Sequence, residues 1–237
     1  MHSHDRTLLA SLGFSDPDKK NRRHDYACQF LAKAENAVAI MHRLMGSRIL
    51  TKEAFHRIDA LVVAANNGDA LSLRRLNEIW ATYDTPPISP ESVSLWRSAI
   101  EAPISKGEGQ YKSTIGFADV LLDLNSKYLF VLRMSESFPE KAHWVSGRKK
   151  VLVEVKIHPV DVGAIIRQLN LYREHYHFDY TPDSETLAVC DFDLQPEDIA
   201  TLRSERIQYL RLGTRFDAYV KEREQSPKQA VPDCLVL

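Results

Sequence analysis

The most informative segment of the sequence is Val151-Leu152-Val153-Glu154-Val155-Lys156-Ile157. Side chains alternate along a β-strand, so the β-branched residues point to one face while Glu154 and Lys156 share the other. An unpartnered charge on so apolar a strand costs several kcal/mol. We therefore expect this carboxylate and this amine in a buried or cleft position, with a partner or a metal ion nearby.

A second acid stands upstream in Ile115-Gly116-Phe117-Ala118-Asp119-Val120-Leu121-Leu122-Asp123-Leu124. Alternation assigns the apolar residues at 118, 120, 122 and 124 to a buried face and leaves Asp119 on the other. The 35 positions between Asp119 and Glu154 (154 − 119) leave room for a hairpin, so the two carboxylates are expected to meet across neighbouring strands. Two hard oxygen ligands beside a lysine suit Mg²⁺ or Mn²⁺ and the hydrolysis of a phosphodiester.

Periodicity divides the rest of the chain into a helical and a mixed part. Apolar residues recur at helical spacing over residues 18–83, which predicts an all-helical N-terminal region. Ser89-Pro90-Glu91 is typical of a helix start, and Pro103 would end that helix. After it we expect strands over 112–124, 128–134 and 150–157, a helix over 162–177, a strand over 186–192, a helix over 196–206, a strand over 208–212, and a charged helix with a tail from 214.

This order, α-β-β-β-α-β-α-β, predicts an α/β fold with a mixed sheet. We expect three parts: a helical N-terminal region over 1–88, a core over 89–213, and a C-terminal helix and tail over 214–237.

Asp119 and the Glu154-x-Lys156 pair resemble the motif of the PD-(D/E)XK nuclease superfamily. Gln168 and Tyr172 lie one turn apart on one face of the expected helix, so both can reach a single cleft. They resemble the QxxxY motif of the RecB-type branch. The resemblance covers residues 89–192 and implies a restriction-endonuclease-like core, αβββαβ in order. Alanine stands at position 118, where the name of the motif has proline.

The resemblance implies a Mg²⁺- or Mn²⁺-dependent deoxyribonuclease. Asp119 and Glu154 would hold the ion, Lys156 would position water or stabilise the phosphate, and Gln168 and Tyr172 would orient the site or contact the nucleic-acid backbone. Members of this superfamily often add an acid or a histidine from the preceding helix. Glu101 is the first candidate for that role and Glu91 the second.

Basic residues near the expected site are candidate contacts to DNA: Lys112, Arg148, Lys149, Lys150 and His158. Such clusters are also common in solvated loops. Among the tryptophans, Trp144 lies in a polar stretch that suits base stacking, whereas Trp80 and Trp96 are expected to be packing residues.

Composition limits the function classes. Lys and Arg number 31 against 32 Asp and Glu, so no global positive field attracts nucleic acid and binding must come from local patches. The longest apolar run has six residues, Ala60 to Ala65, which excludes a membrane span. The polar N-terminus does not resemble a secretory signal, and we expect a cytoplasmic protein. Three widely separated cysteines favour neither a zinc site nor an iron–sulfur cluster.

Three hypotheses follow for function. The first is a metal-dependent nuclease that cuts DNA rather than RNA, of the kind found in defence, recombination or mobile elements, with the helical N-terminal region selecting a target, binding a protein partner or forming a homodimer. The second is a catalytically inactive nucleic-acid-binding or assembly subunit on the same fold. The third is an α/β interaction protein without a nucleic-acid role, which would show no salt-dependent DNA binding.

Overall fold

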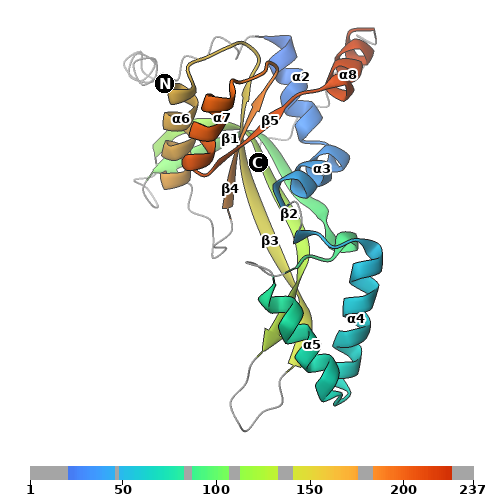
Figure 1. Ribbon diagram of the computed structural model, residues 1–237. Coiled ribbons are helices and arrows are strands. Elements are labelled where there is room, and N and C mark those ends of the chain that lie inside the picture. Colours follow the sequence, from blue (N-terminus) through green and yellow to red (C-terminus); the bar gives the residue numbers. More distant parts are fainter. Residues whose placement is uncertain are drawn as a thin grey trace.

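A computed structural model describes residues 21–45, 48–82, 87–106, 113–132, 141–175 and 184–225. This described part contains a five-stranded mixed sheet and seven α-helices, so the α/β class predicted from the sequence is confirmed (Figure 1). The strands follow one another across the sheet in chain order, from β1 to β5. β1, β2 and β3 pair antiparallel, and β3, β4 and β5 pair parallel. The elements are α2 (Arg22–Leu31), α3 (Ala34–Met45), α4 (Lys52–Asn66), α5 (Ala70–Ala81), the 3-10 helix η3 (Pro90–Ser92), β1 (Ser94–Lys106), β2 (Ser113–Leu132), β3 (Lys141–Lys156), α6 (Val162–His175), β4 (Ser184–Cys190), α7 (Pro196–Ser204), β5 (Ile207–Arg211) and α8 (Thr214–Gln225).

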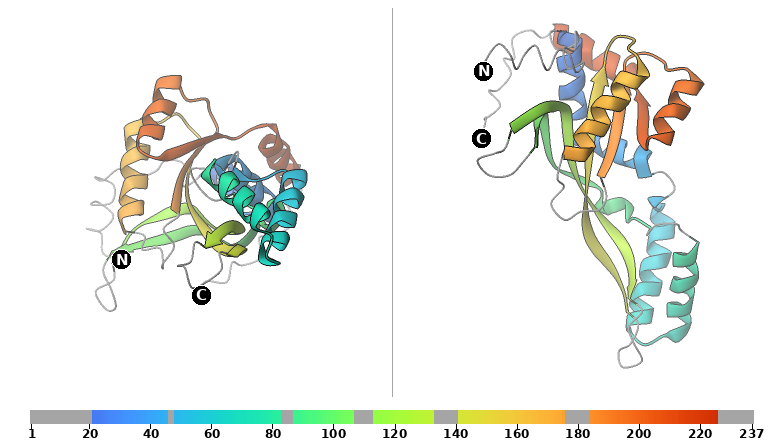
Figure 2. Two further views of the ribbon diagram at one scale, coloured as in Figure 1. Left: turned by 60° about the horizontal axis from the view of Figure 1, so that its bottom comes forward. Right: turned by 90° about the vertical axis from the view of Figure 1, so that its left-hand side faces the viewer.

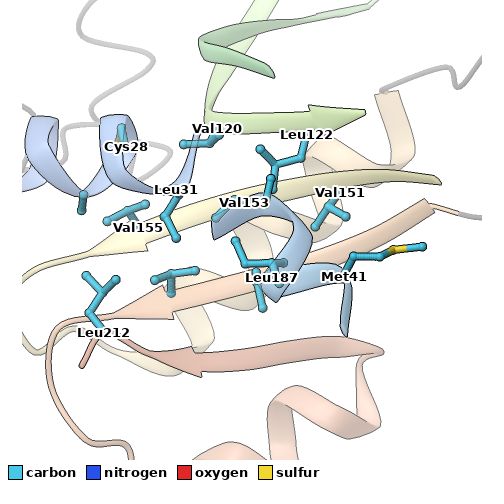
Figure 3. Packing of buried hydrophobic residues seen from close by; sticks show 14 of the residues in the cluster. Cys28, Leu31, Met41, Val120, Leu122, Val151, Val153, Val155, Leu187 and Leu212 are labelled. Carbon is cyan, nitrogen blue, oxygen red and sulfur yellow. The ribbon is translucent and has the colours of Figure 1, made fainter. Parts of the chain in front are cut away.

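Helices cover both faces of the sheet. α2, α3 and α8 lie on one face, where alternate residues of β2 and β3 such as Leu122 and Val153 are buried against Leu31 and Met41 (Figure 3). α6 and α7 lie on the other face and bury Leu152 with Leu169. Because both faces are covered, the central strands read as nearly continuous apolar runs, as is typical of parallel and mixed sheets with helices on both sides.

The hairpin of β2 and β3 extends well beyond the rest of the sheet, and α4 and α5 pack beside its outer end (Figure 2). A separate apolar cluster joins them, with Leu129 of β2 and Ala142 of β3 fully buried against Ile58 and Leu76. Trp144 packs on Phe55, with ring centroids 5.1 Å apart. The molecule therefore has a body around five strands and an arm built on two.

The helical periodicity of the N-terminal third corresponds to α2, α3, α4 and α5. The side chain of Asn21 accepts a hydrogen bond from the Arg23 amide, and that of Thr51 accepts one from Ala54, which satisfies free donors at the starts of α2 and α4. Beyond residue 160, the expected helices and strands agree with α6, β4, α7, β5 and α8 to within a few residues wherever the structure describes them. None of the described helices has the length and apolar character needed to cross a membrane.

The helix predicted over 89–103 is wrong. Ser89-Pro90-Glu91 does begin a helical turn, but the turn is the three-residue η3, and β1 follows at once. Two irregularities of β1 explain the misleading pattern. The register against β2 shifts at Trp96, and Glu101 has a positive φ of 51°. Each changes which face the following residues occupy, so apolar positions recur at intervals of three and four, as they would in a helix.

The strands predicted over 112–124 and 128–134 are one continuous strand, β2, of 20 residues. The intervening polar residues do not break it, because Asn125 and Lys127 pair in register with Arg148 and Ser146 of β3. Correspondingly, β3 starts at Lys141, nine positions before the predicted start at 150.

Candidate active site

Asp119 and Glu154 lie where β2 and β3 separate. The β2–β3 ladder ends at the pair of Val120 and Val153, so the next position along each strand sets Asp119 across from Glu154. Beyond that pair, β2 continues beside β1 as far as Ser113, whereas β3 continues beside β4 as far as Lys156. The sheet therefore opens at this point, and we call the opening, with Asp119, Glu154 and Lys156, the fork.

Both carboxylates of the fork are enclosed, with Asp119 2% and Glu154 0% exposed. Oδ2 of Asp119 accepts a hydrogen bond of 2.8 Å from the backbone N–H of Val155, a donor past the end of the β2–β3 ladder. The Asp119 side chain thus bridges the gap between the two strands. Buried carboxylates need compensating donors or cations, so their placement at one opening concentrates negative charge there.

Lys156 supplies one compensating charge. Its Nζ lies 2.8 Å from Oε1 of Glu154, and only 5% of the residue is exposed. Val155 and Ile157, on either side of it, belong to the apolar cluster on the opposite face of β3. The alternation predicted for this strand therefore holds, and the carboxylate and ammonium groups share one face of it.

His24 of α2 is a site residue that the sequence analysis missed. Its Nε2 lies 3.3 Å from Oδ2 of Asp119, and the residue is 4% exposed. Arg23 makes ion pairs with Asp191 after β4 and Asp217 of α8, which fix the start of α2 against the body. A signal was present: His24 belongs to the buried stripe of α2 with Ala27, Cys28 and Leu31, at spacings of three, four and seven.

Gln168 and Tyr172 contact one another on α6, as their spacing predicts. Gln168 Nε2 donates to the Tyr172 hydroxyl over 2.8 Å, and that hydroxyl donates to the backbone carbonyl of Phe117 over 2.8 Å. Phe117 precedes Asp119 by two positions, so the pair ties α6 to the strand end that carries Asp119. Burial raises the pKa of Tyr172, and the nearby Glu154 carboxylate raises it further. The phenol therefore stays protonated as a donor.

Negative charge at the fork also acts on Cys28. Burial is the largest cause that raises the pKa of this thiol. The carboxylates of Asp119 and Glu154 raise it further, and that of Glu101 does so more weakly. Glu101 lies across from Asp119 on β1, between the register pairs formed by Ile100 and Ala102.

Neither glutamate chosen for the additional acid lies on a long helix. Glu101 is exposed on β1 and Glu91 is exposed in η3, because the helix predicted over 89–103 is absent from the structure. α2 does reach the fork, and it presents a histidine there.

The candidate DNA contacts have different environments. Lys112 lies outside the described residues. Lys149 is 1% exposed and its Nζ lies 3.0 Å from Oε1 of Glu185, which assigns it a structural ion pair in place of a phosphate contact. Arg148 is exposed and Lys150 is half-buried on β3. His158 is exposed just past the fork, with Nε2 3.1 Å from the side-chain amide nitrogen of Asn21.

The expectations for Trp96 and Trp144 are reversed, whereas the side chain of Trp80 lies outside the described residues. Trp144 is a packing residue, since its indole N–H donates to Asp59 of α4 over 3.0 Å. Trp96 is 59% exposed, and the Arg148 guanidinium carbon lies 4.5 Å from its ring centroid. The bulge of β1 at this position accounts for its outward placement.

The donor set of the fork fits a Mg²⁺ or Mn²⁺ ion. In the described ranges, no three His, Cys, Asp or Glu side chains are grouped closely enough to form a complete protein cage. Mg²⁺ does not need one, because it usually keeps several waters and binds through one or two carboxylates together with substrate phosphates. Two buried carboxylates from facing strand positions are such a partial set.

Comparison with known proteins adds no family. The chain matches no protein-family model, no curated protein and no solved structure. What is known of this site therefore rests on its own residues and their geometry.

Proposed function

We propose that this protein is a metal-dependent nuclease that hydrolyses phosphodiester bonds of DNA on a restriction-endonuclease-like core. One observation carries the proposal: two carboxylates and an ammonium group, all at most 5% exposed, gather where two paired strands separate. Charges are rarely retained in such a position unless they compensate one another or serve chemistry. The element order from β1 through β4, three antiparallel strands, a helix and a parallel strand, supports the same core.

Asp119 and Glu154 would hold the ion, and the His24 imidazole beside Asp119 would orient that carboxylate. A bound Mg²⁺ or Mn²⁺ would polarise the scissile phosphate and lower the pKa of a water molecule. The ammonium group of Lys156 donates to Glu154 in this structure. During hydrolysis it would also stabilise the negative charge that develops on the phosphate oxygens.

The remaining groups position these three. The hydrogen bond from the Val155 amide fixes the Asp119 carboxylate between the strands, and the Tyr172 hydroxyl anchors β2 two residues earlier. His24 contacts Asp119 from α2, which lies on the face of the sheet opposite α6. Orientation of this kind matters because a misplacement of about 1 Å can cost about 10²-fold in rate.

A cleavage assay on single- and double-stranded DNA, with Mg²⁺, with Mn²⁺ and with a chelator, tests the proposal. We expect cleavage only with metal, and we expect Asp119→Asn and Glu154→Gln each to lower its rate by about 10²–10³-fold, the typical effect of losing one electrostatic group from an active site. Glu185→Gln is the matched control, because it neutralises the glutamate of the other buried lysine pair on β3. Cleavage that survives either fork substitution would exclude this centre.

The competing proposal is a non-catalytic nucleic-acid-binding or assembly subunit. The observation that favours it is the lack of a group of three metal-ligating side chains in the part of the chain that the structure describes. Mn²⁺ titration by calorimetry separates the nuclease from the non-catalytic subunit. A nuclease centre should bind the ion in the wild type, and the Asp119→Asn variant should no longer bind it. Intact DNA binding with neither metal uptake nor cleavage would favour the subunit.

A further inference from the structure

A row of cations continues from the fork along the same face of the sheet. β2 and β3 pair without a register shift from Val120 and Val153 outward, so alternation places Lys150 and Arg148 on the face of β3 that carries Leu152 and Glu154. Asp123 of β2 pairs with Lys150 of β3 on one side and with Arg97 of β1 on the other. Residues directly opposite one another in an antiparallel ladder share a face, so all three side chains lie on the same face. We call Trp96, Arg97, Arg148 and Lys150 the strip.

Helices cover the face at both ends of the strip. Leu152 belongs to the cluster under α6, and Trp144, on the same side of β3 by alternation, packs against α4. Between these two positions Arg148 is exposed and Lys150 half-buried. Figure 1 shows β2 and β3 running from the body toward α4 and α5. At about 3.3 Å per residue, Arg148 lies roughly 20 Å along β3 from Glu154.

Trp96 is the most unusual member of the strip. It is the most exposed large apolar side chain in the described ranges, at 59%, and it stands out of a bulge beside three cations. The Arg148 guanidinium covers part of its ring at 4.5 Å. A planar cation on an exposed indole does not contribute to a core, but it does form a rigid surface on which a base can stack.

The charge of the strip suits a polyanion. Three cations face one carboxylate, Asp123, which is buried between Arg97 and Lys150 at 3% exposure. The local charge is therefore positive in a chain whose net charge is −1. Base stacking on a side chain requires a base that is free of its own duplex stack, so the aromatic member selects single strands over duplexes.

We propose that the strip binds single-stranded DNA, with a base on Trp96 and phosphates near Arg148, Arg97 and Lys150, and directs the strand toward the fork. This inference rests on the proposed nuclease function for its direction along the sheet. Binding itself requires neither metal nor catalysis, so the two proposals can fail separately.

The test measures binding of a fluorescently labelled oligothymidylate to the full chain in the presence of a chelator. We expect Trp96→Ala to weaken binding by about 5- to 150-fold, which corresponds to the loss of one stacked base. Leu71→Ala is the matched control, because Leu71 is 58% exposed on α5, outside the strip. Arg148→Ala is expected to weaken binding as well and to reduce its dependence on salt, as the loss of one phosphate contact does.

Two further arms identify the ligand. A blunt DNA duplex should bind with the same affinity to the wild type and to Trp96→Ala, because it offers no free base to the indole. An oligouridylate of equal length that binds more tightly than oligothymidylate would overturn the choice of DNA. Unchanged binding of oligothymidylate to Trp96→Ala, or no binding by the wild type, would overturn the strip altogether. Trp96-dependent binding by a chain that never cleaves would leave the strip standing and remove the nuclease.

Discussion

The two halves of β3 show how the surroundings of a strand change the meaning of a charge. Residues 151–156 all pair with β4, the first three of them also pair with β2, and all six are buried, whereas most of residues 141–150 pair with β2 alone and are largely exposed or half-buried. A charged side chain in the inner half, 151–156, needs a partner within the protein, while one in the outer half, 141–150, can be solvated, with the buried Lys149 as the exception. Glu154 and Lys156 in the inner half are therefore informative, and Arg148 becomes so only through its contact with Trp96.

The sharpest test of this comparison uses the two buried lysines of β3. Each pairs with a glutamate at about the same distance, Lys156 with Glu154 at 2.8 Å and Lys149 with Glu185 at 3.0 Å. We expect Lys156→Met to lower the single-turnover cleavage rate by about 10²–10³-fold, because the fork loses its ammonium group. Lys149→Met should leave the rate per folded molecule within about twofold and lower only the free energy of unfolding, as the loss of one partner of a buried pair does.

Stability and catalysis can be separated at Lys156. The single substitution leaves the Glu154 carboxylate buried without its ammonium partner, which is destabilising. In the double variant Glu154→Gln/Lys156→Met both charges are gone, so urea denaturation should show recovered stability while cleavage stays lost. Recovery of cleavage together with stability would mean that neither Glu154 nor Lys156 takes part in the reaction and that the pair acts only on folding.

The apolar clusters of body and arm provide the second test. Leu122 and Leu129 lie on the same strand and both are fully buried, Leu122 in the body and Leu129 against α4 and α5. Truncation of either to alanine should cost about 2–5 kcal/mol. We expect Leu122→Ala to lower hydrogen-exchange protection throughout the sheet, and Leu129→Ala to lower it in α4, α5 and the outer hairpin. Equal loss of protection in both regions by Leu129→Ala would show that body and arm unfold together.

The inner half of β3 was predictable because its signal is local. Alternation at a period of two, interrupted by two charges, needs no knowledge of other elements, and it led to Asp119, Glu154 and Lys156 on neighbouring strands. The contact between Gln168 and Tyr172 was predictable for the same reason, since four positions on a helix bring side chains together. What these residues do remains a prediction.

The parts that the sequence did not reveal depend on distant contacts. β1 is a strand because β2 is available to pair with it, and its bulge and positive φ erased the alternation that would have identified it. His24 stands 95 positions before Asp119 (119 − 24), with α4 and α5 inserted between them, so no spacing rule connects the two. The buried stripe of α2 indicated an inward-facing histidine but not its partner.

A third test uses the thiol next to the fork on β4. Cys190 is the register partner of Lys156, and burial raises its pKa from an ordinary value near 9 to about 12. Because the folded state holds this proton more tightly than the unfolded state, the associated stability is complete below pH 9 and is lost as pH rises toward 12. We expect the free energy of unfolding to fall across this range, by up to about 1.4 kcal/mol per pH unit from this group.

Other groups titrate at alkaline pH, so the measurement is a comparison of slopes. Denaturation curves between pH 8 and 11 for the wild type and for Cys190→Ala should differ, with the shallower dependence in the variant. Identical slopes would mean that the thiol ionises as easily in the folded chain as in the unfolded one. In that case, the surroundings of the inner half of β3 would be less enclosing than its buried side chains indicate.

The smallest effect is expected on the outer surface of the arm. Arg74 and Glu78 form an ion pair one turn apart on α5, with 3.3 Å between Nε and Oε1 and side chains that are 78% and 64% exposed. Water solvates both charges in the folded and the unfolded state, so Arg74→Ala should change the free energy of unfolding by less than about 0.5 kcal/mol, as judged from urea midpoints. High salt should remove even that difference, because the pair is screened. A loss above 1 kcal/mol would contradict the comparison, since it would show that charges on the solvated arm stabilise the fold as strongly as those enclosed at the fork.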